Sequence, residues 1–261
     1  MEKKILYLLT CVGLCWSSCT NEVDEFIGNV EPSTRSVSTA LNANLASLFT
    51  GGAPTLTSAE IKEVNDAYAK MTSINCYRNI DEAVRNKTSY AGTIFLDDTY
   101  ASAYFRKGSL AFPPYGILAS SMEHEFIHMY QRDVQGKKVD TDKEKRDTGM
   151  MEFELAFQGI IRYIHAGYSW TFKGEDGDPS YQSLWTSGLT DPSLIPQYER
   201  EFQTYVASIC ANGKPTSIDI NEFVKWSNIF GEYSRGYSGK GYKFGNYDYG
   251  TSCINSLLKL Y

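Results

Sequence analysis

Apolar residues recur every three or four positions over much of the chain, a spacing typical of amphipathic helices. One stretch between positions 93 and 112 instead holds short runs of branched and aromatic residues, which favour strands. The predicted elements are a helix beginning at Thr57, strands at 93–96, 103–105 and 109–112, and helices at 116–132, 148–166, 196–211 and 219–230. This order predicts an α+β fold with a small mixed sheet and a majority of helices.

The first eighteen residues have the pattern of a cleaved export signal. Lys3 and Lys4 precede an apolar run at 5–14, which is shorter than the roughly 20 residues that span a bilayer. Small residues then precede Cys19 and an abrupt change to polar sequence, which resembles the lipobox of bacterial lipoproteins. We therefore expect a signal peptide at 1–18, a lipid anchor on Cys19 and export to the bacterial cell envelope, at the outer membrane. An ordinary secretory signal is the alternative.

The rest of the chain divides into a polar segment and a globular part. Residues 19–55 lack an apolar period, so we expect a flexible tether there and a single domain over 56–261. A net charge of −6 offers no basic surface for phosphates, which argues against a nucleic-acid partner. Besides Cys19, three cysteines lie beyond the signal, and a bridge between Cys210 and Cys253, with Cys76 buried, is one pairing that the sequence leaves open.

A His-Glu-Phe-Ile-His run at 124–128 holds two of the three histidines of the chain. On a helix, His124 and His128 lie about 40° and one turn apart, so both imidazoles can reach one metal ion at about 2.0–2.1 Å. Glu125 is rotated about 100° from His124, where its carboxylate can take a proton from water that the metal activates. This pattern predicts one Zn²⁺ ion held by the histidines, with Glu125 as the general base.

The run resembles the motif of the zincin metallopeptidases, and the likeness extends over about residues 90–165. The metzincin branch is excluded, because it needs glycine and histidine where this chain has Gln131 and Val134. The gluzincin branch implies a third ligand from a glutamate on the next helix, either Glu154 or Glu152. We favour Glu154, because its helical face continues through large apolar residues. The resemblance also implies that the strand ending at Phe112 is an edge strand that aligns an extended peptide.

Two functions follow as expectations. The first is hydrolysis of peptide bonds in a peptide or protein substrate by a zinc metallopeptidase, lipid-anchored at the envelope. The second is a surface protein that binds glycan or protein on a zincin-like scaffold without catalysis, through the Tyr-rich stretch at 231–250. His165 lies about 16 Å beyond Glu154 along the predicted helix, so we interpret it as a structural histidine.

Overall fold

The computed structural model describes residues 40–137, 148–165, 195–211, 215, 217–233 and 252–260. The chain divides into two compact units, Met1–Val134 and Gln135–Tyr261, where the sequence predicted one domain. The expected signal peptide, Cys19 and nearly all of the Tyr-rich stretch lie outside the described residues. Among the residues described, no helix is both long and apolar enough to cross a bilayer.

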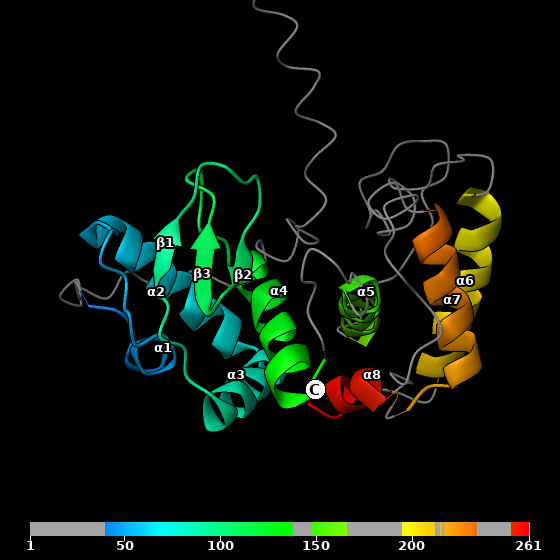
Figure 1. Ribbon diagram of the computed structural model, residues 1–261. Coiled ribbons are helices and arrows are strands. Elements are labelled where there is room, and N and C mark those ends of the chain that lie inside the picture. The colour runs from blue at the N-terminus through cyan, green and yellow to red at the C-terminus, as the bar shows by residue number, and fades with distance from the viewer. Residues whose placement is uncertain are drawn as a thin grey trace, which may run out of the picture. The chain divides into compact units, whose positions relative to one another are not determined.

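The first unit combines a three-stranded sheet with several helices (Figure 1). Its elements are α1 (Ala43–Leu48), α2 (Ser58–Ser73), α3 (Asn75–Lys87), β1 (Ile94–Leu96), β2 (Tyr104–Arg106), β3 (Ser109–Phe112), α4 (Ala119–Met129) and a π-helix, η2 (Tyr130–Val134). The helices α2, α3 and α4 pack against one another, and α4 also contacts β2. The α+β class and the mixed sheet are therefore confirmed.

The helix α2 begins with the capping box that its sequence contains. The Thr57 side chain accepts a hydrogen bond from the Glu60 backbone N–H, and the Glu60 carboxylate accepts one from the Thr57 backbone N–H at 2.6 Å. These two bonds satisfy backbone donors that the first turn of a helix leaves without partners. The buried face of α2 includes Val64, Tyr68 and Met71, at the spacing expected for a helix on a core.

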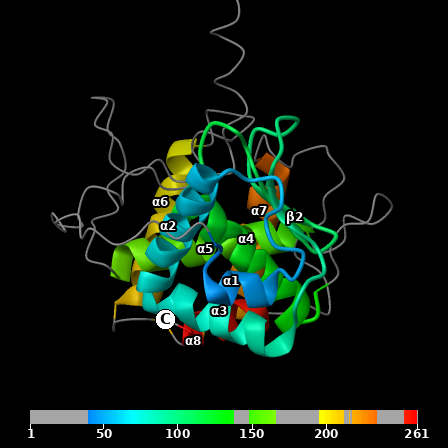
Figure 2. The ribbon, with the colours of Figure 1, turned by 90° about the vertical axis from the view of Figure 1, so that its left-hand side faces the viewer.

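The predicted tether ends earlier than residue 55. Residues 43–48 form α1, and Leu45, Leu48 and Phe49 are buried. Phe49 forms an isolated parallel bridge with Tyr90, and α1 lies beside α3 (Figure 2). A helix of six residues is too short to show a clear apolar period, so these core positions were not recognised in the sequence.

The strand that ends at Phe112 is the central strand of the sheet, so the expectation of an edge strand there is wrong. The order is β1-β3-β2, in which β3 pairs in parallel with β1 and antiparallel with β2. Residues 110–112 are all buried, as is usual for a strand with neighbours on both sides. The strand β2, which contacts α4, is at an edge of the sheet in the described part of the chain.

A tight turn joins β2 to β3. Its two central residues, Lys107 and Gly108, have φ angles of 51° and 78°. Two successive positive φ values are the requirement of a type I′ hairpin turn, which glycine meets without strain. A side chain at Gly92 would meet the Gly108 carbonyl oxygen at 2.3 Å, so glycine also allows the chain before β1 to approach this turn.

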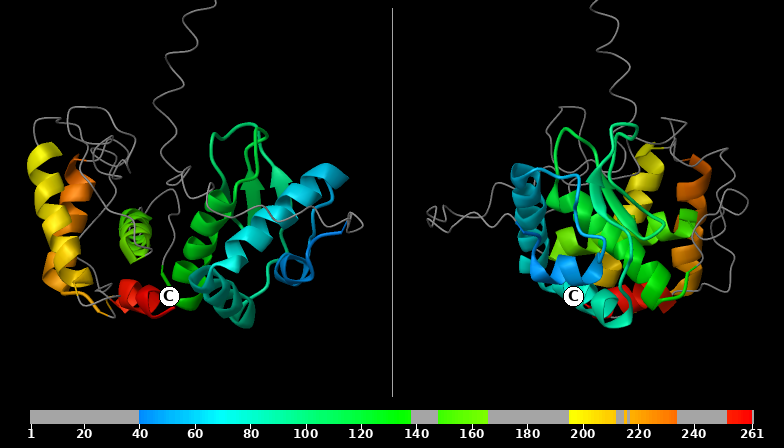
Figure 3. Two further views of the ribbon diagram at one scale, coloured as in Figure 1. Left: turned by 180° about the vertical axis from the view of Figure 1, so that it is seen from behind. Right: turned by 60° about the vertical axis from the view of Figure 1, so that its left-hand side comes forward.

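The second unit is helical in its described residues. Its elements are α5 (Thr148–His165), α6 (Ile195–Cys210), α7 (Ile220–Tyr233) and α8 (Ser252–Lys259). The sequence predicted α5, α6 and α7 with each end within three residues of its observed position, and it did not predict α8. The helix α5 packs against the other three (Figure 3).

Aromatic side chains fill the interior of the second unit. The Phe153 and Phe223 ring centroids lie 5.1 Å apart, and those of Phe202 and Trp226 lie 5.0 Å apart. Contacts of this kind add a small stabilisation to the burial of large rings. Among the described cysteine side chains, Cys76 is buried, and Cys210 is half-buried and forms no disulfide bridge. The pairing of Cys210 with Cys253 is therefore absent.

Candidate metal centre

The helix α4 has an apolar face and a more polar face. Met122, Phe126 and Met129 are buried, and the Phe126 ring lies 6.1 Å from that of Tyr68 on α2. His124 and His128 are half-exposed on another face. The core contacts fix the rotation of α4, and that rotation leaves both imidazoles accessible.

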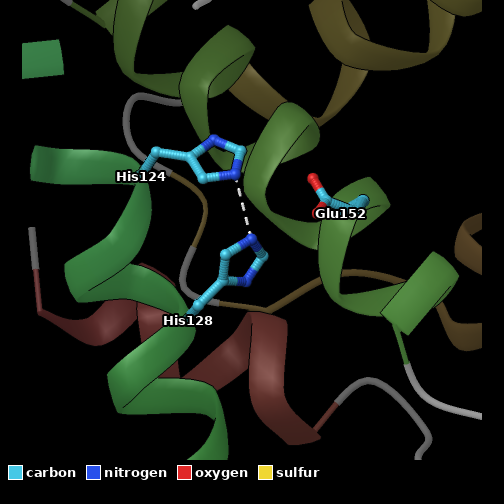
Figure 4. A group of neighbouring side chains, drawn as sticks. All are labelled: His124, His128 and Glu152. Carbon is cyan, nitrogen blue, oxygen red and sulfur yellow. Dashed lines mark hydrogen bonds between the residues drawn. The ribbon is translucent and has the colours of Figure 1, made fainter. Parts of the chain in front are cut away.

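The two histidines point at each other from successive turns of α4 (Figure 4). Their Nε2 atoms are 3.0 Å apart, and the ring planes are inclined at 82°. Two nitrogen ligands at 2.0–2.1 Å from a tetrahedral zinc ion lie about 3.4 Å apart. An opening of a few tenths of an ångström therefore lets both Nε2 atoms bind one ion, so the pair fits the metal expected from the sequence.

Two buried carboxylates flank His124 in the sequence. Glu125 is 5% exposed and Glu123 is 8% exposed. On a helix they are rotated about 100° from His124 in opposite directions. The sequence motif singled out Glu125 alone, and the burial of Glu123 was not foreseen.

Gln131 contacts the second histidine. Its Oε1 lies 2.9 Å from His128 Nδ1, and its side chain is fully buried. Nδ1 is the ring nitrogen that does not face His124. Sequence reasoning missed this residue, because position 131 was considered only as the missing glycine of the metzincin pattern. The available signal was an amide side chain three residues after a candidate ligand.

The π-helix η2 is held by a cluster of charged and aromatic groups. The Tyr90 hydroxyl donates a hydrogen bond to the Asp133 carboxylate, and Arg132 Nε donates to Asp133 Oδ1 at 2.8 Å. The Arg132 guanidinium also lies 4.2 Å from the centre of the Phe105 ring on β2. Burial, followed by the bond to Asp133, raises the pKa of Tyr90, so its hydroxyl remains a donor at neutral pH.

The two candidate glutamates lie on different faces of α5. Glu154 is fully buried, on the face that includes Phe153, Phe157 and Gln158. Glu152, labelled in Figure 4, is half-buried, as are Leu155 and Gly159 along the same stripe. The side chain of His165 lies outside the described residues.

Comparisons with protein-family models, with curated proteins and with solved structures find no match for this chain.

Proposed function

We propose that this protein is a zinc-dependent hydrolase of peptide bonds with a zincin-like fold. The observation that supports it is the 3.0 Å approach of the His124 and His128 Nε2 atoms on an accessible face of α4. Each imidazole is a common zinc ligand, and two of them four residues apart on a helix are a frequent half of a zinc site. The position of Glu125 beside them adds a carboxylate for proton transfer.

The chemistry divides between the ion and the chain. Bound zinc would act as a Lewis acid that lowers the pKa of water and polarises a carbonyl. Glu125 would accept a proton from the attacking water and pass it to the leaving amine. His124 and His128 hold the ion, and their backbone is fixed by the packing of α4.

A glutamate of α5 would supply the third ligand in this proposal. The sequence favoured Glu154, but Glu152 is half-buried, as His124 and His128 are, whereas Glu154 is enclosed. A catalytic zinc site needs a position open to water, so accessible ligands suit it better. We therefore now favour Glu152. Glu152→Gln should weaken zinc binding more than Glu154→Gln, and equal zinc affinities in the two variants would contradict this choice.

The cellular setting of the proposal comes from the N-terminal sequence. A lipid anchor on Cys19 would tether the enzyme to the bacterial envelope, where extended peptides and unfolded proteins are available substrates. Metabolic labelling with a fatty acid should mark the wild-type protein and leave Cys19→Ser unmarked. Equal labelling of both proteins would contradict the anchor.

The experiment that tests the function compares two neighbouring carboxylates. Zinc-loaded wild type should hydrolyse members of a broad peptide library, and Glu125→Gln should lose at least 10²-fold in rate while keeping its zinc. Glu123→Gln is the matched control, since it makes the same change on the other side of His124 and should remain active. A Glu125→Gln protein as active as Glu123→Gln would exclude the proposed mechanism.

A second candidate function is binding of glycan or protein without catalysis. Two exposed aromatic residues favour it: Tyr100 is 50% exposed and Tyr115 is 71% exposed. Exposed tyrosines offer an apolar face and a hydroxyl to a ligand. The same peptide library distinguishes the functions, because a zinc-loaded wild type that hydrolyses no peptide would favour binding.

A further inference from the structure

We propose that Gln131 is a positioning residue that orients His128 and fixes which of its ring nitrogens carries the proton. This inference rests on the zinc site proposed above. The observation that leads to it is the 2.9 Å contact between Gln131 Oε1 and His128 Nδ1, made by a side chain that is fully buried.

The hydrogen bond determines the tautomer of the imidazole. An amide oxygen can only accept, so the Gln131 contact places the proton on Nδ1. The neutral ring then has its lone pair on Nε2, the nitrogen that faces His124 Nε2 at 3.0 Å. Zinc binds the deprotonated nitrogen, so Gln131 prepares the correct atom of His128 for the ion. Such partners of a ligating histidine commonly change metal affinity by about 10–100-fold when they are removed.

The backbone around Gln131 explains why its side chain reaches this position. The chain changes from α-helical to π-helical winding at Tyr130, between His128 and Gln131. A π-helical turn shifts the side chains that follow it around the helix, and such turns are frequent at functional sites. In this protein, the turn accompanies the Gln131 contact with Nδ1 of a residue only three positions earlier.

Neighbouring residues hold the π-helix in place. Asp133 accepts hydrogen bonds from Tyr90 and Arg132, and Arg132 lies over the Phe105 ring. These contacts attach η2 to the segment before β1 and to β2. Gln131 is thus anchored on a fixed segment, and its burial prevents the amide from turning toward water. A preorganised partner of this kind loses little entropy when the metal binds.

The test uses two substitutions of similar size. Gln131→Met removes the acceptor and keeps the length of the side chain, whereas Gln131→Glu keeps an acceptor at the same place. Zinc affinity, measured by competition with a chromophoric chelator, should fall about 10–100-fold in Gln131→Met and stay at or above the wild-type value in Gln131→Glu. Gln197→Met, at an exposed glutamine of α6, is the matched control and should bind zinc as the wild type does.

The outcomes separate this inference from the zinc site itself. A wild-type protein that binds no zinc would overturn both the proposed zinc site and the positioning role of Gln131. Wild-type binding with equal affinity in Gln131→Met, or with the same loss in Gln131→Glu, overturns the positioning role and leaves the zinc site standing. NMR of the zinc-loaded wild type gives an independent measure if Gln131→Met does not fold. The His128 Nδ1–H should be protected from exchange, and a proton that exchanges as in free imidazole would overturn the role.

Discussion

Two clusters in the first unit are built from the same three residue types. In one, Asp81 accepts hydrogen bonds from the Tyr68 hydroxyl at 2.8 Å and from Arg85 Nε at 2.9 Å. In the other, Asp133 accepts from Tyr90 and from Arg132. The chemistry of the two clusters is nearly identical, so the differences between them come from their places in the fold.

Burial is the first difference. The Asp81 side chain is 2% exposed, whereas that of Asp133 is 23% exposed. Water can replace a lost partner in the second cluster much more easily than in the first. The Asp81 cluster should therefore contribute more to the free energy of unfolding.

Location is the second difference. The Asp81 cluster joins α2 to α3, and the Asp133 cluster attaches η2, which holds Gln131, to Tyr90. The same three residue types can thus serve the scaffold in one place and the candidate metal site in another. Substitutions in the two clusters should separate loss of stability from loss of zinc affinity.

Asp81→Ala should give the largest effect on stability. It leaves the buried Tyr68 hydroxyl and the Arg85 guanidinium without their acceptor, so the free energy of unfolding should fall by about 2–3 kcal/mol. Urea unfolding followed by circular dichroism measures this, and zinc affinity should not change. The control is Glu82→Ala, at the exposed neighbouring carboxylate. Equal losses in the two variants would contradict the assignment.

Asp133→Ala should lower the free energy of unfolding only slightly but should weaken zinc binding. The half-exposed cluster contributes about 0.5–1 kcal/mol to the free energy of unfolding. Its loss should loosen η2, so zinc affinity should fall by roughly 3–10-fold through Gln131 and His128. Asp98→Ala removes an exposed carboxylate elsewhere in the same unit and is the matched control. A larger stability loss than in Asp81→Ala, with zinc affinity intact, would reverse the comparison.

The pH dependence of stability should show the smallest effect. Burial raises the pKa of Asp81 above its ordinary value of 3.8, against the hydrogen bonds from Tyr68 and Arg85, which lower it. The folded state then binds this proton more tightly than the unfolded state. The free energy of unfolding should therefore fall as pH rises above 3.8 through the folded pKa.

The Asp81→Asn variant isolates this contribution, because it cannot titrate at position 81. The difference in free energy of unfolding between wild type and Asp81→Asn should become less favourable to the wild type as pH rises from below 3.8 toward neutrality. Urea unfolding at a series of pH values measures it. A difference that moves the other way would mean that the hydrogen bonds outweigh burial.

Local patterns in the sequence were enough for much of the fold. The helix beginning at Thr57, the three strands and the helix of the histidine motif depend on neighbouring residues, and each was predicted within a few positions of its observed bounds. The helix α3 was missed, because Asp81 interrupts its buried stripe of Tyr77, Ile80 and Val84. A buried charge is tolerated there only because Tyr68 and Arg85, which the sequence does not place together, are its partners.

Part of the geometry of the candidate site could also be predicted from the sequence. The close approach of His124 and His128 follows from helical spacing alone. The proposed role of Gln131 depends on a change to π-helical winding, which no simple residue pattern predicts. The strand order could not be predicted either, since three short strands permit several pairings and the sequence does not decide among them. The preference between Glu152 and Glu154 changed once the burial of each side chain was known.

Zinc content is the most direct test of the proposed metal centre. Wild type, His124→Ala and His128→Ala would be equilibrated with zinc, freed of excess metal by gel filtration and measured by atomic emission. Wild type should retain one zinc ion per chain, and each histidine variant should retain almost none. A wild type without zinc, or histidine variants that keep the full content, would contradict a metal site built on these two residues.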